Sequence, residues 1–242
     1  MNISDNRKGS HIDSQTSQAS RFSLAQVRLA PGLLSNGRAV TPIMECPDLM
    51  HVLGAAGACT LMLIDESVLE HKITCTIKTA AASRGRVVTL ALPGGEAIKQ
   101  PVAFESLRAQ TAELNVEQAI LVGGGTLINL GLYWAAGGNG DFRCPACVIV
   151  PTNAMAIADV ALGGLGMLNA ADGTKNAWRR RRDPDGVYLY PHFLSGAPDY
   201  VRRDGLVEVL KHCLLQDATR IDEVASLYRP MTRLPCPATR WH

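Results

Sequence analysis

A run of three glycines marks the segment of the chain best suited to approach a phosphate group. The glycines occupy positions 123–125, between an apolar run at 119–122 and a helical pattern at 127–132. Glycine lets the backbone turn tightly and come close to a pyrophosphate, while the first turn of a helix offers N–H groups and the positive end of its dipole. The pattern predicts a dinucleotide site. A glycine-rich turn without a ligand is the alternative.

Charged side chains follow two other apolar runs. Asp65 comes directly after the run 61–64, and Glu96 and Lys99 lie in the loop after the run 87–92. An acidic side chain at a strand end can accept hydrogen bonds from ribose hydroxyls, and Glu96 with Lys99 can hold a ribose and a phosphate. The alternative is that Asp65 caps a helix and that Glu96 and Lys99 form an exposed ion pair.

The elements that would position these residues alternate along the chain. Five short apolar runs predict strands, with helix-like stretches between most of them: 27–29, 60–64, 87–92, 119–122 and 147–150. Strands that alternate with helices pair in parallel through right-handed crossovers, so their carboxyl ends meet at one edge. We therefore expect an α/β fold with a doubly wound parallel sheet, a Rossmann-like nucleotide-binding domain whose ligand cleft lies at that edge.

The expected domain organisation has three parts. Residues 1–25 are rich in Ser, Gln, Asn and charge without periodic apolar positions, which is typical of a flexible tail. Residues 26–184 contain the alternating elements and would form the nucleotide-binding domain. Residues 185–242 would then be the opening of a truncated helical domain.

Composition limits the class of protein. With 242 residues, 47% of them apolar, the chain can bury a full core, and a formal net charge of +2 is too balanced to predict nucleic acid or a membrane as partner. The longest apolar stretch, 147–168, contains a proline, an asparagine and an aspartate, which favours buried core over a membrane span.

Seven scattered cysteines and no apolar leader favour a reducing cytoplasm. Cys144 and Cys147 have redox or zinc spacing, but without a second pair structural cysteines are favoured.

Seven short motifs follow one another along the chain. They are Ile64-Asp65-Glu66, Gly94-Gly95-Glu96-x-x-Lys99, Gly123-Gly124-Gly125, Pro151-Thr152, Asp159-x-x-x-Gly163-Gly164, Lys175-Asn176 and Gly205-x-x-Glu208-x-x-Lys211. In this order they resemble the 3-dehydroquinate synthases and related sugar phosphate cyclases, from about residue 27 to 217. Iron-type alcohol and glycerol dehydrogenases share the general architecture, but the Gly-Glu-x-x-Lys, Lys-Asn and Glu-x-x-Lys motifs favour the cyclases.

The resemblance implies an NAD-dependent reaction on a sugar phosphate substrate. A hydroxyl would be oxidised transiently, phosphate eliminated, the oxidised carbon reduced again, and the ring closed by an intramolecular aldol addition. Matching positions would line NAD with Asp65, Gly95, Glu96, Lys99, Gly123, Gly124, Gly125, Thr126, Asn129, Thr152, Asn153, Phe193 and Leu194. The catalytic residues facing the substrate would be Asp159, Lys175, Asn176 and Lys211, and Glu208 would be a zinc or cobalt ligand.

Four positions depart from the pattern of the resembled family. Asn129 replaces an aspartate, Ile128 a glycine and Asn153 a threonine, so the contacts to NAD are altered. Leu165 replaces a lysine, which removes a cation from the expected substrate site. The arginine run 179–182 could supply the missing cation, and a solvated charge run is the alternative.

The metal site is expected to be incomplete. Relatives add two histidine ligands from a helical domain, whereas this chain ends 34 residues after Glu208, so a divalent metal is doubtful. His212 would point about 100° away from Lys211 on a helix, and His242 is terminal, so neither is favoured as a replacement. His192, beside the expected cofactor loop, is a better candidate for acid–base work, although lone histidines are more often structural.

Two functions stay open on these residues. The leading interpretation is a divergent NAD-dependent sugar phosphate cyclase, which is a carbon–oxygen lyase, and the alternative is a catalytically degenerate nucleotide-binding pseudoenzyme or partner subunit. The enzyme is favoured by the retained Lys175, Asn176, Glu208 and Lys211. The pseudoenzyme is favoured by the lost lysine at Leu165 and by the missing histidine region. Apolar residues at helical spacing in the segment 200–227 need a partner surface, which predicts a homodimer or a complementing subunit.

Overall fold

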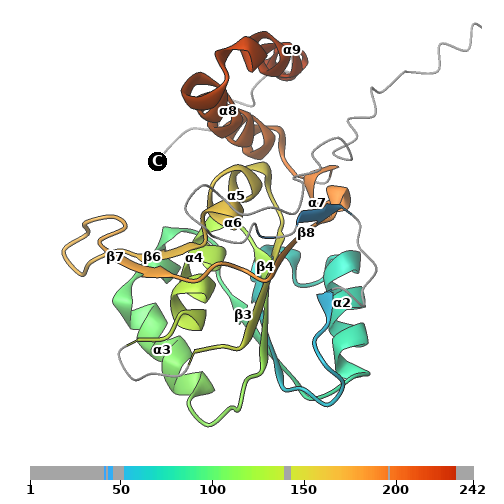
Figure 1. Ribbon diagram of the computed structural model, residues 1–242, viewed down its shortest axis with the longest axis vertical. Helices are drawn as coiled ribbons and strands as arrows, with labels where there is room; N and C mark the ends of the chain where they lie inside the picture. Colours follow the sequence, from blue (N-terminus) through green and yellow to red (C-terminus); the bar gives the residue numbers. More distant parts are fainter. Residues whose placement is uncertain (1–40, 42, 46–51, 139–142, 196, 233–242) are drawn as a thin grey trace, which may run out of the picture.

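The computed structural model describes Thr41 and residues 43–45, 52–138, 143–195 and 197–232. The predicted tail, residues 1–25, and the predicted strand at 27–29 lie outside these residues. The described part has a central sheet with helices on both faces and two further helices beyond one edge of the sheet (Figure 1).

The central sheet has six strands, all parallel. They are β1 (Ile43–Glu45), β2 (Thr60–Asp65), β3 (Val87–Leu92), β4 (Gln118–Gly123), β5 (Ala146–Pro151) and β8 (Gly186–Leu189). Their order is β1-β8-β5-β4-β2-β3. From β2 the chain moves outward to β3 and then crosses back to β4 on the other side of β2. This reversal is a topological switch point, where open α/β sheets bind ligands at the carboxyl ends of the strands. The predicted doubly wound parallel sheet is confirmed.

Helices connect and cover these strands. They are η2 (Glu66–Val68), α2 (Lys72–Ala82), η3 (Glu96–Lys99), α3 (Pro101–Thr111), α4 (Gly125–Ala135), α5 (Ala154–Ala158), α6 (Val160–Gly163), α7 (Pro191–Ser195), α8 (Asp199–Gln216), η4 (Ala218–Arg220) and α9 (Ile221–Thr232). Helix α2 covers one face of the sheet, while α3 and α4 cover the other (Figure 1).

The core has two layers because alternate residues of a strand point to opposite faces. In β2, Leu61 and Leu63 pack with α3 and α4, whereas Met62 and Ile64 pack with α2. All four are fully buried, which is why this strand reads as a continuous apolar run. Helix α4 is buried from Leu127 to Ala135, since it lies between the sheet and a hairpin.

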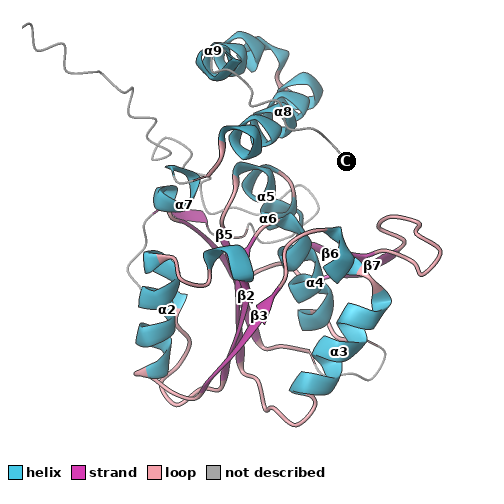
Figure 2. Cartoon of the chain, turned by 180° about the vertical axis from the view of Figure 1, so that it is seen from behind, coloured by secondary structure: helices cyan, strands magenta, loops and turns pink. Residues whose placement is uncertain are grey.

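That hairpin was not predicted from the sequence. Strands β6 (Leu165–Leu168) and β7 (Trp178–Arg181) pair antiparallel outside the main sheet and lie over α4 (Figure 2). A Cβ added at Gly166 would lie 2.1 Å from the backbone nitrogen of Tyr133, so only glycine allows the hairpin this close to α4. The hairpin places the loop 169–177 beside η3.

The sheet continues past residue 184, where the sequence predicts the end of the nucleotide-binding domain. Strand β8 pairs with both β5 and β1, although it lies in the segment 185–242 assigned to the helical domain. Arg182 stabilises this return to the sheet: it is 6% exposed and binds Asp185 at 2.7 Å, and Asp185 also accepts from the backbone nitrogen of Cys147. The division into domains stays a prediction.

Helices α8 and α9 lie beyond the carboxyl ends of the strands (Figure 1). Helix α8 packs on α5 at Gly205, where an added Cβ would lie 2.2 Å from the Cβ of Ala154. No described helix is long and apolar enough to cross a membrane.

Candidate functional site

Three strand ends converge on Asp65, the last residue of β2. A Cβ added at Gly123, at the end of β4, would lie 3.1 Å from the Cβ of Asp65, and one added at Gly94, after β3, would lie 3.5 Å from its Oδ2. Asp65 is 9% exposed, and its Oδ1 accepts hydrogen bonds from the backbone nitrogen and hydroxyl of Ser67. Asp65 therefore caps the N-terminus of η2, as the alternative interpretation predicted. Its position at the switch point is also the one that a ribose-binding carboxylate needs.

The glycine turn leads directly into α4, as the sequence predicts. Gly124 is the N-cap residue, and a Cβ added there would lie 2.8 Å from Nδ2 of Asn153. Asn153 begins α5, since its Oδ1 accepts from the backbone nitrogen of Ala156. Thr152, 8% exposed at the end of β5, donates from its backbone nitrogen to the carbonyl of Gly123. The turn therefore leaves room for backbone or ligand atoms but none for a side chain.

Asn129 carries an unsatisfied polar atom inside α4. It is 4% exposed, and its Nδ2 donates to the carbonyl of Gly125 one turn earlier. Its Oδ1 is buried and has no hydrogen-bond partner among the described residues. A buried acceptor without a partner costs free energy, about 1–3 kcal/mol, unless a donor reaches it. A ribose hydroxyl or a carboxamide N–H of a bound dinucleotide is such a donor.

The ion pair considered for Glu96 and Lys99 is present, but it is not an exposed one, because Lys99 is buried. Lys99 is 5% exposed, and its Nζ lies 2.5 Å from Oδ1 of Asn176 and 3.4 Å from Oε1 of Glu96. The loop after β3 is thereby joined to the loop between β6 and β7. Gly95 has a φ of 95°, which lets the chain turn into η3. Lys175, next to Asn176, is exposed.

Asn169 completes this cluster and was missed by the sequence analysis. It follows β6 directly and is 2% exposed. Its side chain donates to the carboxylate of Glu96 and accepts from the backbone nitrogen of Asn176, and its backbone nitrogen donates to the carbonyl of Lys99. Nothing in a single asparagine between two strands signals such a role, because the hairpin that positions it was itself not predicted.

Acid should weaken this cluster through Glu96. Burial raises the pKa of Glu96, but the hydrogen bond from Asn169 and the charges of Lys99 and Lys175 outweigh it, so the pKa lies below its ordinary value of 4.5. A carboxyl group with a lowered pKa stabilises the fold above its unfolded pKa and loses that contribution as the pH falls through the folded pKa. We expect Glu96→Gln to be less stable than wild type to urea at pH 7, with the difference shrinking as the pH falls below the ordinary pKa of 4.5 and vanishing below the lowered pKa of the folded state.

The control for this pH dependence is Glu105→Gln, which removes an exposed pair with Arg108 whose two side chains are 57% and 59% exposed. Such a pair contributes little, so its stability difference should be small at every pH. An acid-independent difference for Glu96→Gln would contradict the assignment.

The remaining predicted catalytic residues lie on α8 and before α6. Lys211 contacts Glu208, and its pKa is raised by that hydrogen bond and by the charges of Glu208 and Asp159. Asp159 is exposed between α5 and α6. Helix α8 therefore brings Lys211 and Glu208 to the side of α5 where Asp159 lies.

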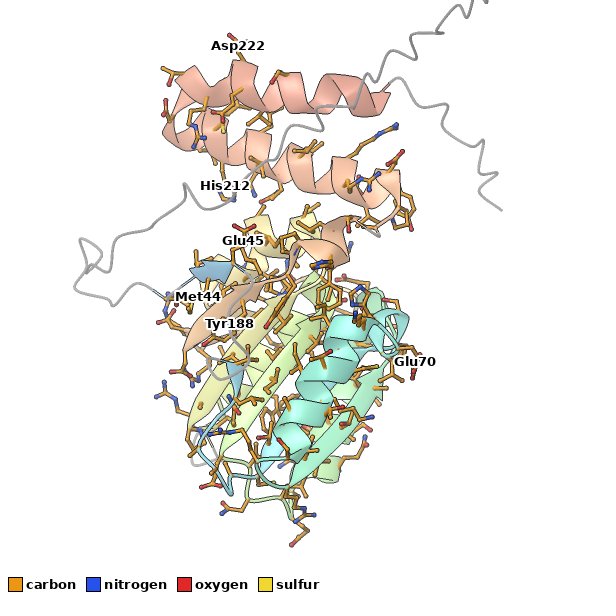
Figure 3. The ribbon with its side chains drawn as sticks, turned by 90° about the vertical axis from the view of Figure 1, so that its right-hand side faces the viewer. Met44, Glu45, Glu70, Tyr188, His212 and Asp222 are labelled. Carbon is orange, nitrogen blue, oxygen red and sulfur yellow. The ribbon has the colours of Figure 1, made fainter. Side chains whose placement is uncertain are left out.

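Glu208 has one histidine beside it. Nε2 of His212 lies 3.6 Å from Oε1 of Glu208, because residues four apart share one face of a helix. Figure 3 shows His212 on the side of α8 towards the sheet. No third histidine, cysteine or acidic side chain joins these two among the described residues. Two ligands are fewer than a stable zinc site needs.

The two predicted cofactor residues on α7 differ in burial. Phe193 is 4% exposed and stacks on His71 with the ring centroids 4.2 Å apart, so it belongs to the core on the α2 face. Leu194 is half-buried. His192, considered for acid–base work, is exposed.

The four arginines of the run 179–182 are each bound within the hairpin region. Arg179 donates to the carbonyl of Asn176, and Arg181 forms an ion pair with Asp183. The Cζ of Arg180 lies over the ring of Tyr133, 4.2 Å from its centroid. Arg181 is opposite Leu165 in the β6–β7 register. Arg182 donates to the carbonyls of Cys144 and Pro145, which come just before β5. The end of the hairpin that carries Arg182 therefore lies near the N-terminal ends of the strands, away from the glycine turn at their C-terminal ends.

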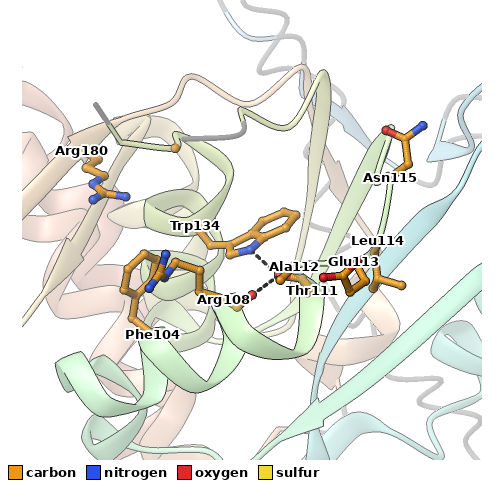
Figure 4. A pocket seen from close by; sticks show the side chains of 10 residues that line it. Phe104, Arg108, Thr111, Ala112, Glu113, Leu114, Asn115, Trp134 and Arg180 are labelled. Carbon is orange, nitrogen blue, oxygen red and sulfur yellow. Dashed lines mark hydrogen bonds between the residues drawn. The ribbon is translucent and has the colours of Figure 1, made fainter. Parts of the chain in front are cut away.

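A groove of about 490 Å³ lies on the same side, between the C-terminal ends of α3 and α4 (Figure 4). Phe104, Trp134 and Arg180 line it. The glycine turn lies at the opposite, N-terminal end of α4, so this groove is separate from the converging strand ends.

The two cysteines with redox spacing are structural. Cys144 and Cys147 are both buried, and burial raises the pKa of the Cys144 thiol to about 11 and that of Cys147 further. Thiols with raised pKa values are poor nucleophiles and poor metal ligands.

The chain is similar in sequence to known enzymes and similar in fold to solved structures. No protein-family model matches the chain. The 3-dehydroquinate synthase of Chlamydia trachomatis serovar L2 is 32% identical over 162 residues, which are 65% of this chain and 42% of the relative. The chain thus spans about half the length of the curated relatives it matches.

Solved structures show the same fold. A 2-deoxy-scyllo-inosose synthase complexed with carbaglucose-6-phosphate, NAD+ and Co2+ has a TM-score of 0.59 at 24% identity, covering 70% of this chain and 48% of that one. The 2-epi-5-epi-valiolone synthase from Streptomyces hygroscopicus subsp. jinggangensis 5008, with NAD+ and Zn2+ bound, has a TM-score of 0.60 at 16% identity, covering 81% of this chain and 60% of that one.

Proposed function

Because the chain is a relative of the 3-dehydroquinate synthases, we propose that it acts as an NAD-dependent sugar phosphate cyclase, a carbon–oxygen lyase that eliminates phosphate and closes a carbocycle. The observation that carries the proposal is the meeting of the glycine turn, Asp65 and the buried Lys99–Asn176 pair around the carboxyl edge of one sheet. A dinucleotide and a phosphate ester both need this combination of backbone N–H groups, carboxylate and ammonium.

NAD would lie across the switch point between β2 and β4. Its pyrophosphate fits the N-terminus of α4 at Gly124 and Gly125, and the unsatisfied Oδ1 of Asn129 is an acceptor for a ribose or carboxamide donor. Asp65 would accept from a ribose hydroxyl. When bound, NAD supplies the acceptor and donor of a hydride. The residues predicted for this role are Gly95, Glu96, Lys99, Gly123, Thr126, Thr152, Asn153, Phe193 and Leu194.

The sugar phosphate would bind between the loop 169–177 and α8. Lys175 is exposed and can neutralise a leaving phosphate, and the ammonium of Lys211 stays charged because Glu208 and Asp159 raise its pKa. Asn176 can accept or donate at a substrate hydroxyl while it holds Lys99. In this arrangement Asp159 orients Lys211.

A divalent zinc or cobalt ion would be held here by Glu208 and His212. These two side chains supply one carboxylate and one imidazole on the same helix face, which fits half of a zinc coordination sphere. In a complete site the metal would polarise the hydroxyl that is oxidised. We propose that any tight metal binding needs ligands from outside the described residues.

The assembly and location of the protein are part of the same proposal. Val207, Leu214 and Leu215 on α8 are 56%, 60% and 75% exposed, which supports a homodimer or a complementing subunit. We place the protein in the cytoplasm because seven scattered cysteines, an odd number, favour a reducing compartment over a disulfide framework. The second candidate function is a nucleotide-binding pseudoenzyme, which is favoured by Leu165 and by the incomplete ligand set.

Release of inorganic phosphate tests the proposal. The purified chain is incubated with NAD+, Co2+ and either a six-carbon or a seven-carbon sugar phosphate, and phosphate is measured with carbocyclic product. We expect activity on one of the two substrates and a fall of about 100-fold on Lys175→Met, since the leaving group then loses its cation.

The matched control is Lys78→Met, an exposed lysine on α2 away from the strand ends. NAD+ binding without any phosphate release would select the pseudoenzyme instead. No NAD+ binding at all would overturn both candidate functions.

A further inference from the structure

We infer that Asn169 is a positioning residue that sets the geometry of Lys99 before any ligand binds. The inference rests on the proposed function in one respect only, namely that Lys99 contacts the ligand. The contacts of Asn169 within the chain are independent of it.

The side chain of Asn169 bridges two loops that are distant in the sequence. Its Nδ2 donates to Oε1 of Glu96 at 2.9 Å, and its Oδ1 accepts from the backbone nitrogen of Asn176 at 3.0 Å. Its own backbone nitrogen donates to the carbonyl of Lys99 at 2.8 Å. At 2% exposure it has no access to bulk water, so lost contacts are not replaced.

These contacts orient both partners of Lys99. The bond to Glu96 directs that carboxylate towards Nζ of Lys99, which lies 3.4 Å from the same Oε1. The bond to the backbone of Asn176 fixes the residue whose Oδ1 accepts from Nζ. One amide therefore determines where the ammonium of Lys99 points.

The loop itself is built to reach this position. Asn176 has a φ of 53°, a left-handed conformation that asparagine tolerates better than most residues. The loop closes on itself through the pair Ala170 and Thr174, and Asp172 accepts from the backbone nitrogen of Thr174. Asn169 anchors the start of this closed loop to its end, so the loop and η3 behave as one preorganised unit.

Lysine acylation measures the effect without any ligand. The full chain is treated briefly with acetic anhydride, and modification of each lysine is quantified by peptide mass spectrometry. We expect Asn169→Ala to raise the rate at Lys99 about tenfold, because the buried ammonium loses both oriented partners. Exposed Lys78 serves as the internal reference and should not change.

Gln118→Ala is the matched control. Gln118 is also a buried amide, 4% exposed, that joins two segments by donating to the carbonyl of Val52 and accepting from the backbone of Gly54. It lies at the start of β4, at the opposite edge of the sheet. An equal rise at Lys99 in Gln118→Ala would mean general loosening and would overturn the inference.

Exchanging donor and acceptor gives the sharpest test. Asn169→Asp alone places two carboxylates, those of Asp and Glu96, against each other, and their repulsion should expose Lys99. When Glu96→Gln is added, the new glutamine amide can donate to the new aspartate, so the hydrogen bond is restored with its direction reversed. We expect the double variant to return the rate at Lys99 to within about threefold of wild type. A double variant as reactive as Asn169→Asp would contradict the assigned hydrogen bond.

NAD+ affinity separates this inference from the proposed function. If wild type binds NAD+, Asn169→Ala should weaken binding about tenfold while Gln118→Ala leaves it within twofold. If wild type binds no NAD+, the proposed function fails, but the labelling still decides the role of Asn169. Unchanged labelling of Lys99 in Asn169→Ala would overturn the inference even in a protein that binds NAD+.

Discussion

Replacing Gly124 by valine is expected to weaken NAD+ binding about 100-fold or more, equivalent to about 2.7 kcal/mol. The new side chain would begin 2.8 Å from Nδ2 of Asn153 and would occupy the space in front of the first turn of α4. A pyrophosphate can use the N–H groups of that turn only if it approaches them directly. Calorimetric titration of wild type and variant with NAD+ measures the difference.

The fold should survive this substitution. The nearest atom to the added Cβ belongs to the side-chain amide of Asn153 and not to backbone, so a shift of that side chain, at the expense of its cap on α5, can relieve the contact. Gly163→Ala is the control, because a Cβ there meets nothing within 4 Å. Equal affinities of Gly124→Val and wild type would exclude the glycine turn as the pyrophosphate site, and the binding residues would then have to be sought elsewhere.

The parts of the fold that the sequence predicted are those where local pattern and tertiary packing agree. The runs at 60–64, 87–92, 119–122 and 147–150 are buried or half-buried strands of a parallel sheet, so their continuous apolar character identifies them. The carboxyl ends then follow from topology, which is why the meeting of Asp65 and the glycine turn could be predicted.

The missed strands have patterns that local reasoning misreads. Strand β7 consists of Trp178 and three arginines, a charge run by composition. It is a strand because it pairs with β6, and its Arg180 lies over the rings of Tyr133 and Phe104. Strand β1 has three residues and β8 has four, too few for a periodic signal. Their pairing comes from the sheet and not from their own propensity.

The same distinction applies to the site. Glu96 and Lys99 were recognised by type and spacing, but the burial of Lys99 depends on Asn176 and Asn169, which lie 77 and 70 residues later in an unpredicted hairpin. His212 was set aside because it points away from Lys211. On a helix it nevertheless shares a face with Glu208, four residues earlier, and this is the relation that matters for a ligand pair.

The second large effect is expected at Gly205, the point where α8 rests on α5. A Cβ there would lie 2.2 Å from the Cβ of Ala154 and 2.8 Å from its carbonyl carbon, so the backbone of one helix must move. Gly205→Val should therefore lift α8 and separate Lys211 and Glu208 from Asp159. We expect phosphate release to fall about 100-fold or more, while NAD+ affinity stays within about threefold because the strand ends are untouched.

Amide hydrogen exchange makes this prediction testable even in a chain without measurable turnover. Helix α8 should exchange faster in Gly205→Val than in wild type, since its packing on α5 is lost, while β2 and β4 should keep their protection. Asp204→Asn, at an exposed position on the same helix, should change neither exchange nor turnover. The double variant Gly205→Ala with Ala154→Gly moves one methyl group from α5 to α8. It should recover part of the exchange protection that Gly205→Val loses, because the closest contact, the one between the two Cβ atoms, is then removed. If α8 exchanged at the wild-type rate in Gly205→Val, the close packing of the two helices, and with it the approach of Lys211 to Asp159, would be refuted.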